Sequence, residues 1–279
     1  MSEYCEYVSR VAYSRADFVD LLRHLLYSPS MSVPKQANEL RVKIFADGAE
    51  KASMVELARD PLIKGFTTNP TLMRKAGVTD YAGFAKEVLA EIKDKPVSFE
   101  VFSDDFKEME RQARIINAWA KNVYVKIPVT NTKRESSADL IKKLASEGVK
   151  INATAILTVP QVRHIVAALN PKVPAVISVF AGRIADTGVD PLPIMKECKA
   201  ITAANPNYEL LWASPRQLLD IYNAEEAKCE IITVTPDILK KLGKVGYDHH
   251  ELSLDTVKMF YDDGQKVGYT LYESQTNFQ

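Results

Sequence analysis

Eight short runs of β-branched and apolar residues alternate with longer stretches typical of helices, and this alternation constrains the fold more than any other feature. The runs are RVKIFAD, LIKGFTT, VSFEVF, NVYVKIPV, VKINATAI, PAVISVF, YELLWAS and EIITV. Strands that alternate with helices along the chain indicate a parallel sheet, and eight such strands close into a barrel. The sequence therefore predicts an α/β fold built as a single (β/α)8 barrel.

The chain has 279 residues, slightly more than the roughly 250 of a typical single barrel. We expect residues 1–40 to form an N-terminal helical extension, with one amphipathic helix near Arg15–Leu26 packed on the barrel. The barrel is expected over residues 41–262, with a last helix near 252–261, and a loosely structured C-terminal tail over 263–279.

Charge and composition exclude several classes of function. The 36 Lys and Arg residues balance 36 Asp and Glu residues, whereas a general nucleic-acid binder would show a basic excess. No run approaches the roughly 18 apolar residues of a membrane span, and the charged N-terminal stretch lacks the apolar segment of a signal peptide. Three cysteines without metal-ligand spacing indicate a reducing compartment. We therefore expect a cytoplasmic protein with neither nucleic-acid nor membrane partners.

Polar side chains recur on one face of the strand-like runs, near their carboxyl ends. In VYVKI, the aliphatic residues Val123, Val125 and Ile127 share one face and leave Lys126 on the other. Polar groups at this end of a barrel usually build an active site, and burying an unpaired charge costs several kcal/mol or more. Seven of the eight runs follow this pattern, which predicts an enzyme site containing Asp47, Asn69, Ser98, Glu100, Lys126, Asn152, Thr154, Ser178, Phe180, Trp212 and Ser214.

Lys126 is the candidate nucleophile of this site. A lysine amine attacks a carbonyl only when it is deprotonated, and an apolar environment disfavours its charged form. Such a lysine suits Schiff-base chemistry. Glu100 and Asp47 supply the carboxyl groups that proton transfer requires. The alternative is a structural lysine that is paired with one of these carboxylates and held in its charged form.

Arg183 and Arg216 follow the sixth and seventh runs, with Ser214 beside the latter. Loops near the end of a barrel commonly bind phosphate, and the guanidinium fork matches phosphate geometry. The alternative is a pair of surface arginines. The sequence contains no zinc pattern, Walker loop or dinucleotide fingerprint, so we expect neither a metal nor a cofactor.

Seven collinear segments resemble the transaldolase family. They are IFADGA, GFTTNPTLM, VSFEV, VYVKIPVT, KINATAI, ISVFAGRIAD and ASPRQ, and they cover roughly residues 42 to 240. The length is similar to that of the compact transaldolases and fructose-6-phosphate aldolases. The compact members assemble into rings through a C-terminal helix that this tail does not resemble. The resemblance therefore does not decide whether the chain forms a homo-oligomer.

The resemblance implies a cofactor-free mechanism on sugar phosphates. Lys126 would attack the ketone of a ketose phosphate, and Glu100 and Thr154 would shuttle protons through a water. Asp47 would take the proton of the C4 hydroxyl as the C3–C4 bond breaks. The remaining residues would bind substrate: its hydroxyls at Asn69, Asn152 and Ser178, and its phosphate at Arg183, Ser214 and Arg216.

Two positions bear on the choice of reaction. The aldolase members carry glutamine at the Glu100 position and tyrosine at the Phe180 position, whereas this chain resembles the transaldolases at both. The resemblance therefore favours transfer of a dihydroxyacetone unit in the pentose phosphate pathway. A fructose-6-phosphate aldolase, a transaldolase for another sugar and a barrel that binds sugar phosphates without turnover are the alternatives.

Overall fold

A computed structural model describes residues 34–271, and the helix expected near Arg15–Leu26 lies outside them. The chain divides into two compact units, of which one spans residues 36–244 and contains the sheet. Its strands form a closed parallel barrel in chain order, as predicted. They are β1 (Lys43–Asp47), β2 (Ile63–Thr67), β3 (Val97–Glu100), β4 (Val123–Pro128), β5 (Ile151–Ile156), β6 (Ala175–Val179), β7 (Tyr208–Trp212) and β8 (Ile231–Val234).

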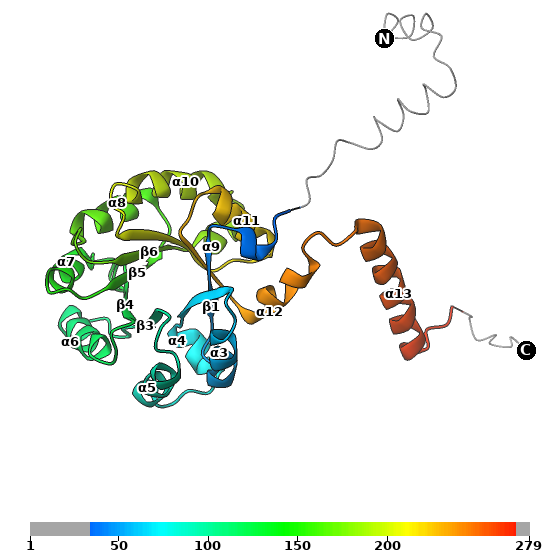
Figure 1. Cartoon of the computed structure of the whole chain (residues 1–279), viewed down its shortest axis with the longest axis horizontal. Helices are drawn as coiled ribbons and strands as arrows, with labels where there is room; N and C mark the ends of the chain where they lie inside the picture. Colours follow the sequence, from blue (N-terminus) through cyan, green and yellow to red (C-terminus); the bar gives the residue numbers. More distant parts are fainter. Residues whose placement is uncertain (1–33, 272–279) are drawn as a thin grey trace, which may run out of the picture. The chain divides into compact units, whose positions relative to one another are not determined.

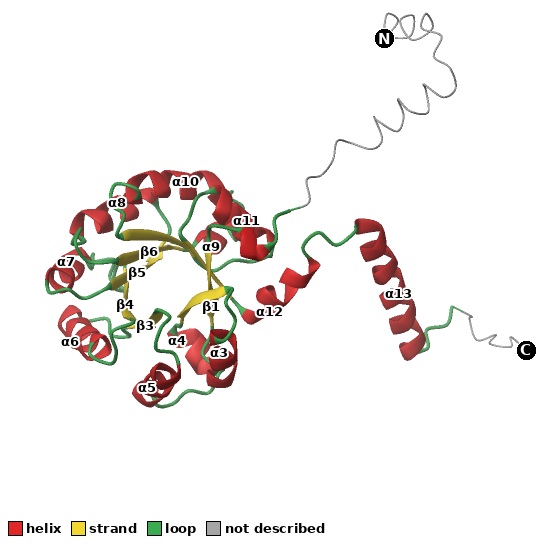
Figure 2. Cartoon of the chain, in the orientation of Figure 1, coloured by secondary structure: helices red, strands yellow, loops and turns green. Residues whose placement is uncertain are grey.

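Helices surround the strands of this unit (Figures 1 and 2). They are α3 (Lys51–Ala58), α4 (Pro70–Lys75), α5 (Tyr81–Glu91), α6 (Phe106–Asn117), α7 (Ala138–Ser146), α8 (Val159–Ala168), α9 (Ala181–Ala185), α10 (Pro191–Thr202), α11 (Leu219–Glu226) and α12 (Pro236–Leu239), with short 3-10 turns at η1 (Ala37–Glu39) and η2 (Lys240–Lys244).

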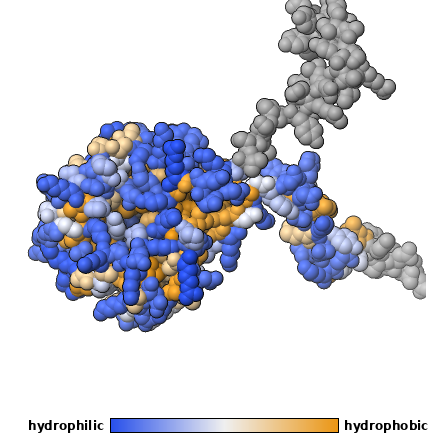
Figure 3. All heavy atoms as spheres, viewed as in Figure 1, coloured by the Kyte–Doolittle hydropathy of each residue, from blue (hydrophilic) through white to orange (hydrophobic). Residues whose placement is uncertain are grey.

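Helix α6 illustrates how the sequence produces this layer. Asp105 caps the helix by accepting a hydrogen bond from the backbone N–H of Glu108. Met109, Ala113 and Ile116 are buried, and their spacing of three and four residues places them on one face. That face packs against the sheet, while the surface of the unit seen in Figure 3 is largely hydrophilic.

Two apolar clusters pack against the two faces of the barrel sheet. The larger lies between the sheet and the helices, and the smaller fills the interior with Phe45, Val176, Leu211, Ala213 and Ile231. Burying branched and aromatic side chains inside the barrel makes it a packed core rather than a channel. The polar side chains described below lie at the carboxyl ends of the strands.

The predicted orientation of β7 is wrong. Leu211 and Ala213 belong to the interior cluster, whereas Trp212 packs between the sheet and the helices. The run YELLWA has apolar residues on both faces, so its alternation does not indicate which face points into the barrel. Ser214 follows the strand and has a left-handed backbone (φ 57°). It lines the cavity at the carboxyl ends of the strands, which is described below.

The second unit contains α13 (His249–Val267), which is longer than the helix expected over 252–261. Asp248 caps it by accepting hydrogen bonds from the backbone N–H groups of His250 and Glu251. Gly268 ends it with φ 70°, a conformation that glycine adopts without strain. Within residues 34–271, no helix combines the length and hydrophobicity that crossing a bilayer requires.

Candidate active site

A cavity of about 500 Å³ opens at the carboxyl ends of the barrel strands. Ten of the eleven residues predicted to act on substrate line it, namely Asp47, Asn69, Glu100, Lys126, Thr154, Ser178, Phe180, Arg183, Ser214 and Arg216. The exception is Asn152, which is fully buried and hydrogen-bonded to Ser178. Residues separated by up to 169 positions are therefore brought together by closure of the barrel.

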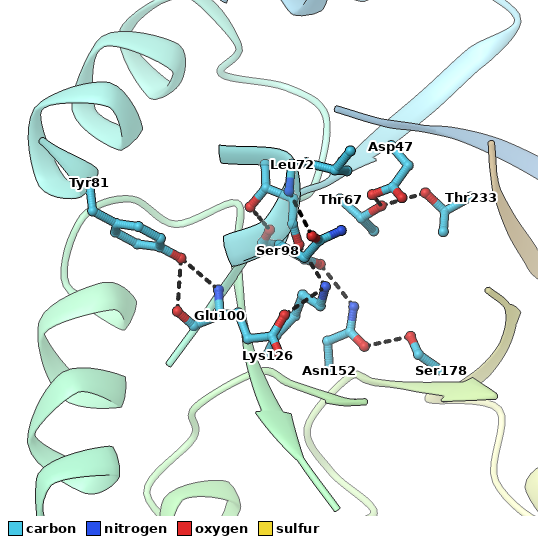
Figure 4. A network of polar contacts seen from close by, with 12 residues as sticks. Asp47, Thr67, Leu72, Tyr81, Ser98, Glu100, Lys126, Asn152, Ser178 and Thr233 are labelled. Carbon is cyan, nitrogen blue, oxygen red and sulfur yellow. Dashed lines mark hydrogen bonds and ion pairs between the residues drawn. The ribbon is translucent and has the colours of Figure 1, made fainter. Parts of the chain in front are cut away.

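Lys126 lies on β4 with only 6% of its surface exposed. Its Nζ donates a hydrogen bond to the backbone oxygen of Thr68 at 2.6 Å and lies 3.2 Å from Oε2 of Glu100 (Figure 4). The parallel pairing of β3 with β4 produces this contact because it sets Glu100 directly beside Lys126. The nearest proton acceptor on a side chain is thus a carboxylate that also faces the cavity.

Asp47 ends β1 and receives a chain of hydroxyl hydrogen bonds. Thr67 Oγ1 donates to Asp47 Oδ1 at 2.8 Å, and Thr67 also contacts the hydroxyl of Thr233. Because the Thr67 hydroxyl has a single proton, Thr233 must be the donor to Thr67. Desolvation by the surrounding protein raises the pKa of Asp47, and the positive charge of Lys126 opposes this shift.

Thr67 and Thr233 line the cavity but were absent from the predicted set. Thr233 gives the eighth strand a polar interior residue as well. Its signal was present in the sequence, since Thr233 lies two residues after the interior residue Ile231. A β-branched threonine within IITV resembles an ordinary strand residue, so composition alone does not distinguish it.

A row of polar side chains crosses β3, β5 and β6. Asn152 Nδ2 donates to Ser98 Oγ at 3.0 Å, and Ser178 Oγ donates to Asn152 Oδ1 at 2.7 Å. These bonds fix the amide of Asn152 and aim the Ser178 oxygen (Figure 4). Thr154 Oγ1 is buried and makes no hydrogen bond to another described residue, so it is available to a bound molecule.

Asn69 follows β2 and has a local structural role in addition to lining the cavity. Its Oδ1 accepts a hydrogen bond from the backbone N–H of Leu72 at 2.9 Å and thereby caps α4. Pro70 occupies the first position of that helix, where its missing N–H is not needed. The cap uses only Oδ1, so the Nδ2 group of Asn69, a residue of the cavity lining, is not needed for the helix.

Two arginines lie at the mouth of the cavity. The Arg183 guanidinium lies 5.3 Å from the centre of the Phe180 ring. Arg216 donates from Nε to Asp186 Oδ1 at 2.9 Å, and these hydrogen bonds raise the pKa of Arg216 and lower that of Asp186. The ion pair fixes the orientation of Arg216 while both partners stay about half exposed.

Gly182 brings α9 into contact with the segment that follows β7. Its N–H donates to the backbone oxygen of Ala213 at 3.2 Å. A Cβ atom at this position would lie 1.6 Å from the carbonyl oxygen of Ser214, so only glycine allows this approach. Arg183 and Ser214 are thereby held at the same end of the cavity.

Comparisons with known proteins agree with this geometry. Residues 44–276 match the family described as Transaldolase/Fructose-6-phosphate aldolase. A probable transaldolase of Chelativorans sp. (strain BNC1) is 35% identical over 236 residues, which cover 81% of this chain and 100% of the relative. A probable transaldolase of Bdellovibrio bacteriovorus is 34% identical, with coverage of 81% and 99%.

A third relative, probable transaldolase 2 of Listeria monocytogenes, is 35% identical over 206 residues, or 72% of this chain and 88% of the relative. Residues 44–276 contain every residue of the cavity and all eight strands apart from Lys43, the first residue of β1. The chain belongs to the transaldolase/fructose-6-phosphate aldolase family.

Proposed function

We propose that this protein is a transaldolase that carries a dihydroxyacetone unit as a Schiff base on Lys126. The donor is a ketose phosphate, sedoheptulose 7-phosphate or fructose 6-phosphate. The acceptor is glyceraldehyde 3-phosphate or erythrose 4-phosphate, as in the cytoplasmic pentose phosphate pathway. The observation that carries the proposal is the buried Nζ of Lys126 in the cavity, 3.2 Å from the Glu100 carboxylate.

The first half of the reaction forms the imine. A proton moves from the Lys126 ammonium to Glu100, and the freed lone pair attacks the C2 carbonyl of the donor. The attacking nitrogen passes a second proton to the carbonyl oxygen, which becomes the C2 hydroxyl. Glu100 then returns its proton to this hydroxyl, which leaves as water. Thr154, on the next strand, is available to hold that water. The product is a protonated imine between Lys126 and the sugar.

The second half breaks and remakes a carbon–carbon bond. Asp47 takes the proton of the C4 hydroxyl, C4 becomes an aldehyde, and the electrons of the C3–C4 bond move into the iminium to form an enamine. The shortened aldose phosphate leaves, and the enamine carbon attacks the aldehyde of the acceptor. Asp47 gives its proton to the new alkoxide, which becomes a hydroxyl, and hydrolysis of the imine regenerates Lys126. The raised pKa of Asp47 suits a group that must both accept and return a proton.

The remaining cavity residues would bind the substrate. Arg183, Ser214 and Arg216 provide the cationic and hydroxyl donors for a phosphate at the mouth. Asn69 and Ser178 would bind the hydroxyls of the three-carbon unit. Asn152 would act through Ser178, since it lies beneath the cavity surface. Phe180 carries no hydroxyl that could activate water against the enamine, which favours transfer over release of dihydroxyacetone.

Reductive trapping tests this proposal. The enzyme is incubated with fructose 6-phosphate without acceptor, reduced with borohydride, and mapped by mass spectrometry. We expect a single adduct of the dihydroxyacetone unit or the intact sugar on Lys126, and no adduct or turnover in Lys126→Ala. Lys43→Ala is the matched control, because Lys43 also lies on a barrel strand, β1, but is not among the residues that line the cavity. An adduct on another lysine, or turnover by Lys126→Ala, would refute the mechanism.

A further inference from the structure

The first residue of α5 reaches the backbone of Glu100 from outside the barrel. The Tyr81 hydroxyl donates a hydrogen bond to the carbonyl oxygen of Glu100 at 2.8 Å and accepts one from its N–H at 2.8 Å. Figure 4 shows the ring extending from its helix to Glu100, on the side away from Asn152. One hydroxyl therefore satisfies both backbone groups of the residue whose carboxylate faces Lys126.

These two backbone groups need a partner because a neighbouring strand ends early. The backbone oxygen of Ser98 accepts a hydrogen bond from the N–H of Thr68, on the side of β2. The N–H of Val101 donates to the backbone oxygen of Lys126, on the side of β4. Backbone groups alternate in direction along β3, so those of Glu100 face the side of β2. That strand stops at Thr67, and the Tyr81 hydroxyl occupies the position of the missing strand residue.

The Tyr81 ring is itself held firmly. Its centre lies 5.3 Å from that of Phe102, 6.0 Å from Trp119 and 6.3 Å from Phe99. These contacts involve the ring alone and leave the hydroxyl to Glu100. Burial raises the pKa of Tyr81, so the phenol keeps the proton that it donates to the carbonyl oxygen.

We propose that Tyr81 is a positioning residue that holds Glu100 at the end of β3, so that its carboxylate stays within proton-transfer distance of Lys126. This inference rests on the proposed function of Lys126 and Glu100. Tyr81 is not among the residues that line the cavity, so it acts only through Glu100. Displacing a catalytic group by about 1 Å can reduce the rate by up to roughly 100-fold. Hydrogen bonds to both the N–H and the carbonyl oxygen of Glu100 would prevent such a displacement.

The substitution Tyr81→Phe removes the hydroxyl and keeps the aromatic packing. We expect kcat and the rate of borohydride-trapped adduct formation to fall about tenfold, or ~1.4 kcal/mol in activation free energy. KM for fructose 6-phosphate should change less than twofold, because the side chains proposed to bind phosphate lie in α9 and in the segment after β7. Tyr208→Phe is the matched control: Tyr208 is buried, lies outside the cavity, and should keep the wild-type rate.

A double-mutant cycle then tests whether Tyr81 acts through Glu100. In the Glu100→Ala background, adding Tyr81→Phe should produce no further decrease in the trapping rate, which is followed over hours. An unchanged rate in Tyr81→Phe would overturn the inference, and so would an equal loss in the Glu100→Ala background. Failure of the wild-type enzyme to trap substrate on Lys126 would instead refute the proposed function itself.

Discussion

The substitution Gly182→Ala should damage the end of the cavity that we propose to bind phosphate. The added Cβ would lie 1.6 Å from the Ser214 carbonyl oxygen, whereas real Cβ atoms essentially never approach within 3.0 Å of another heavy atom. The two backbone segments must therefore separate by roughly 1.4 Å. No side-chain rotation can relieve this contact, because the obstructing atoms belong to the backbone.

The expected cost follows from that displacement. Overpacking of a rigid site typically destabilises a protein by about 1–3 kcal/mol, which lowers the Tm of a domain of this size by about 5 °C. Arg183 and Ser214 flank the contact and would move with it. A displacement of about 1 Å at a binding group can cost roughly 100-fold in activity, so kcat/KM for fructose 6-phosphate should fall by about that factor, mainly through KM.

Thermal unfolding and steady-state kinetics measure the two effects. Gly243→Ala is the matched control, because its Cβ would enter open space and its backbone is not left-handed. That variant should keep the wild-type Tm and kcat/KM. If Gly182→Ala also kept both, the close approach of α9 to the segment after β7 would not organise the proposed phosphate site, and the reasoning would fail.

Three further predictions concern charge and chemistry. The pKa of Asp47 is raised, so between its ordinary and its raised value the native state binds more protons than the unfolded chain. The stability of the protein therefore falls as pH rises through that window. In denaturant unfolding, Asp47→Asn should be more stable than wild type at pH 7, and the difference should vanish toward pH 3. Arg216→Lys loses the fork that binds Asp186 and should raise KM for fructose 6-phosphate about tenfold; an unchanged KM would exclude Arg216 from phosphate binding. Glu100→Gln combined with Phe180→Tyr should increase release of free dihydroxyacetone relative to transfer, and a constant product ratio would contradict the roles given to these positions.

The sequence predicted the strands well because each has a clear local signature. Apolar runs separated by helical stretches set the barrel, and Lys126 was recognisable because a charged residue interrupts a run of buried aliphatic residues. The alternation fails where both faces are apolar, as around Trp212. It also overlooks a β-branched polar residue such as Thr233, whose role depends on a hydroxyl contact with another strand.

Contacts between distant residues lie beyond such patterns. No periodicity links Tyr81 to the backbone of Glu100, since the bond depends on where β2 ends in space. The ion pair of Arg216 with Asp186 joins two loops in the same way. Such contacts arise from tertiary packing, so the sequence indicated the chemical groups of the site but not the arrangement that orients them.

The pairing of β1 with β8 has a consequence for how activity appears during folding. Lys43 lies opposite Ile231 in this pair, so barrel closure joins segments at opposite ends of the sheet. Forming such a distant contact carries a large entropic cost and tends to be slow. Because the Thr233–Thr67–Asp47 chain spans this seam, a nascent chain without its last strand lacks part of the proposed proton-transfer site. Catalytic competence should therefore emerge late, together with closure of the sheet, and refolding assays that follow activity should report that step.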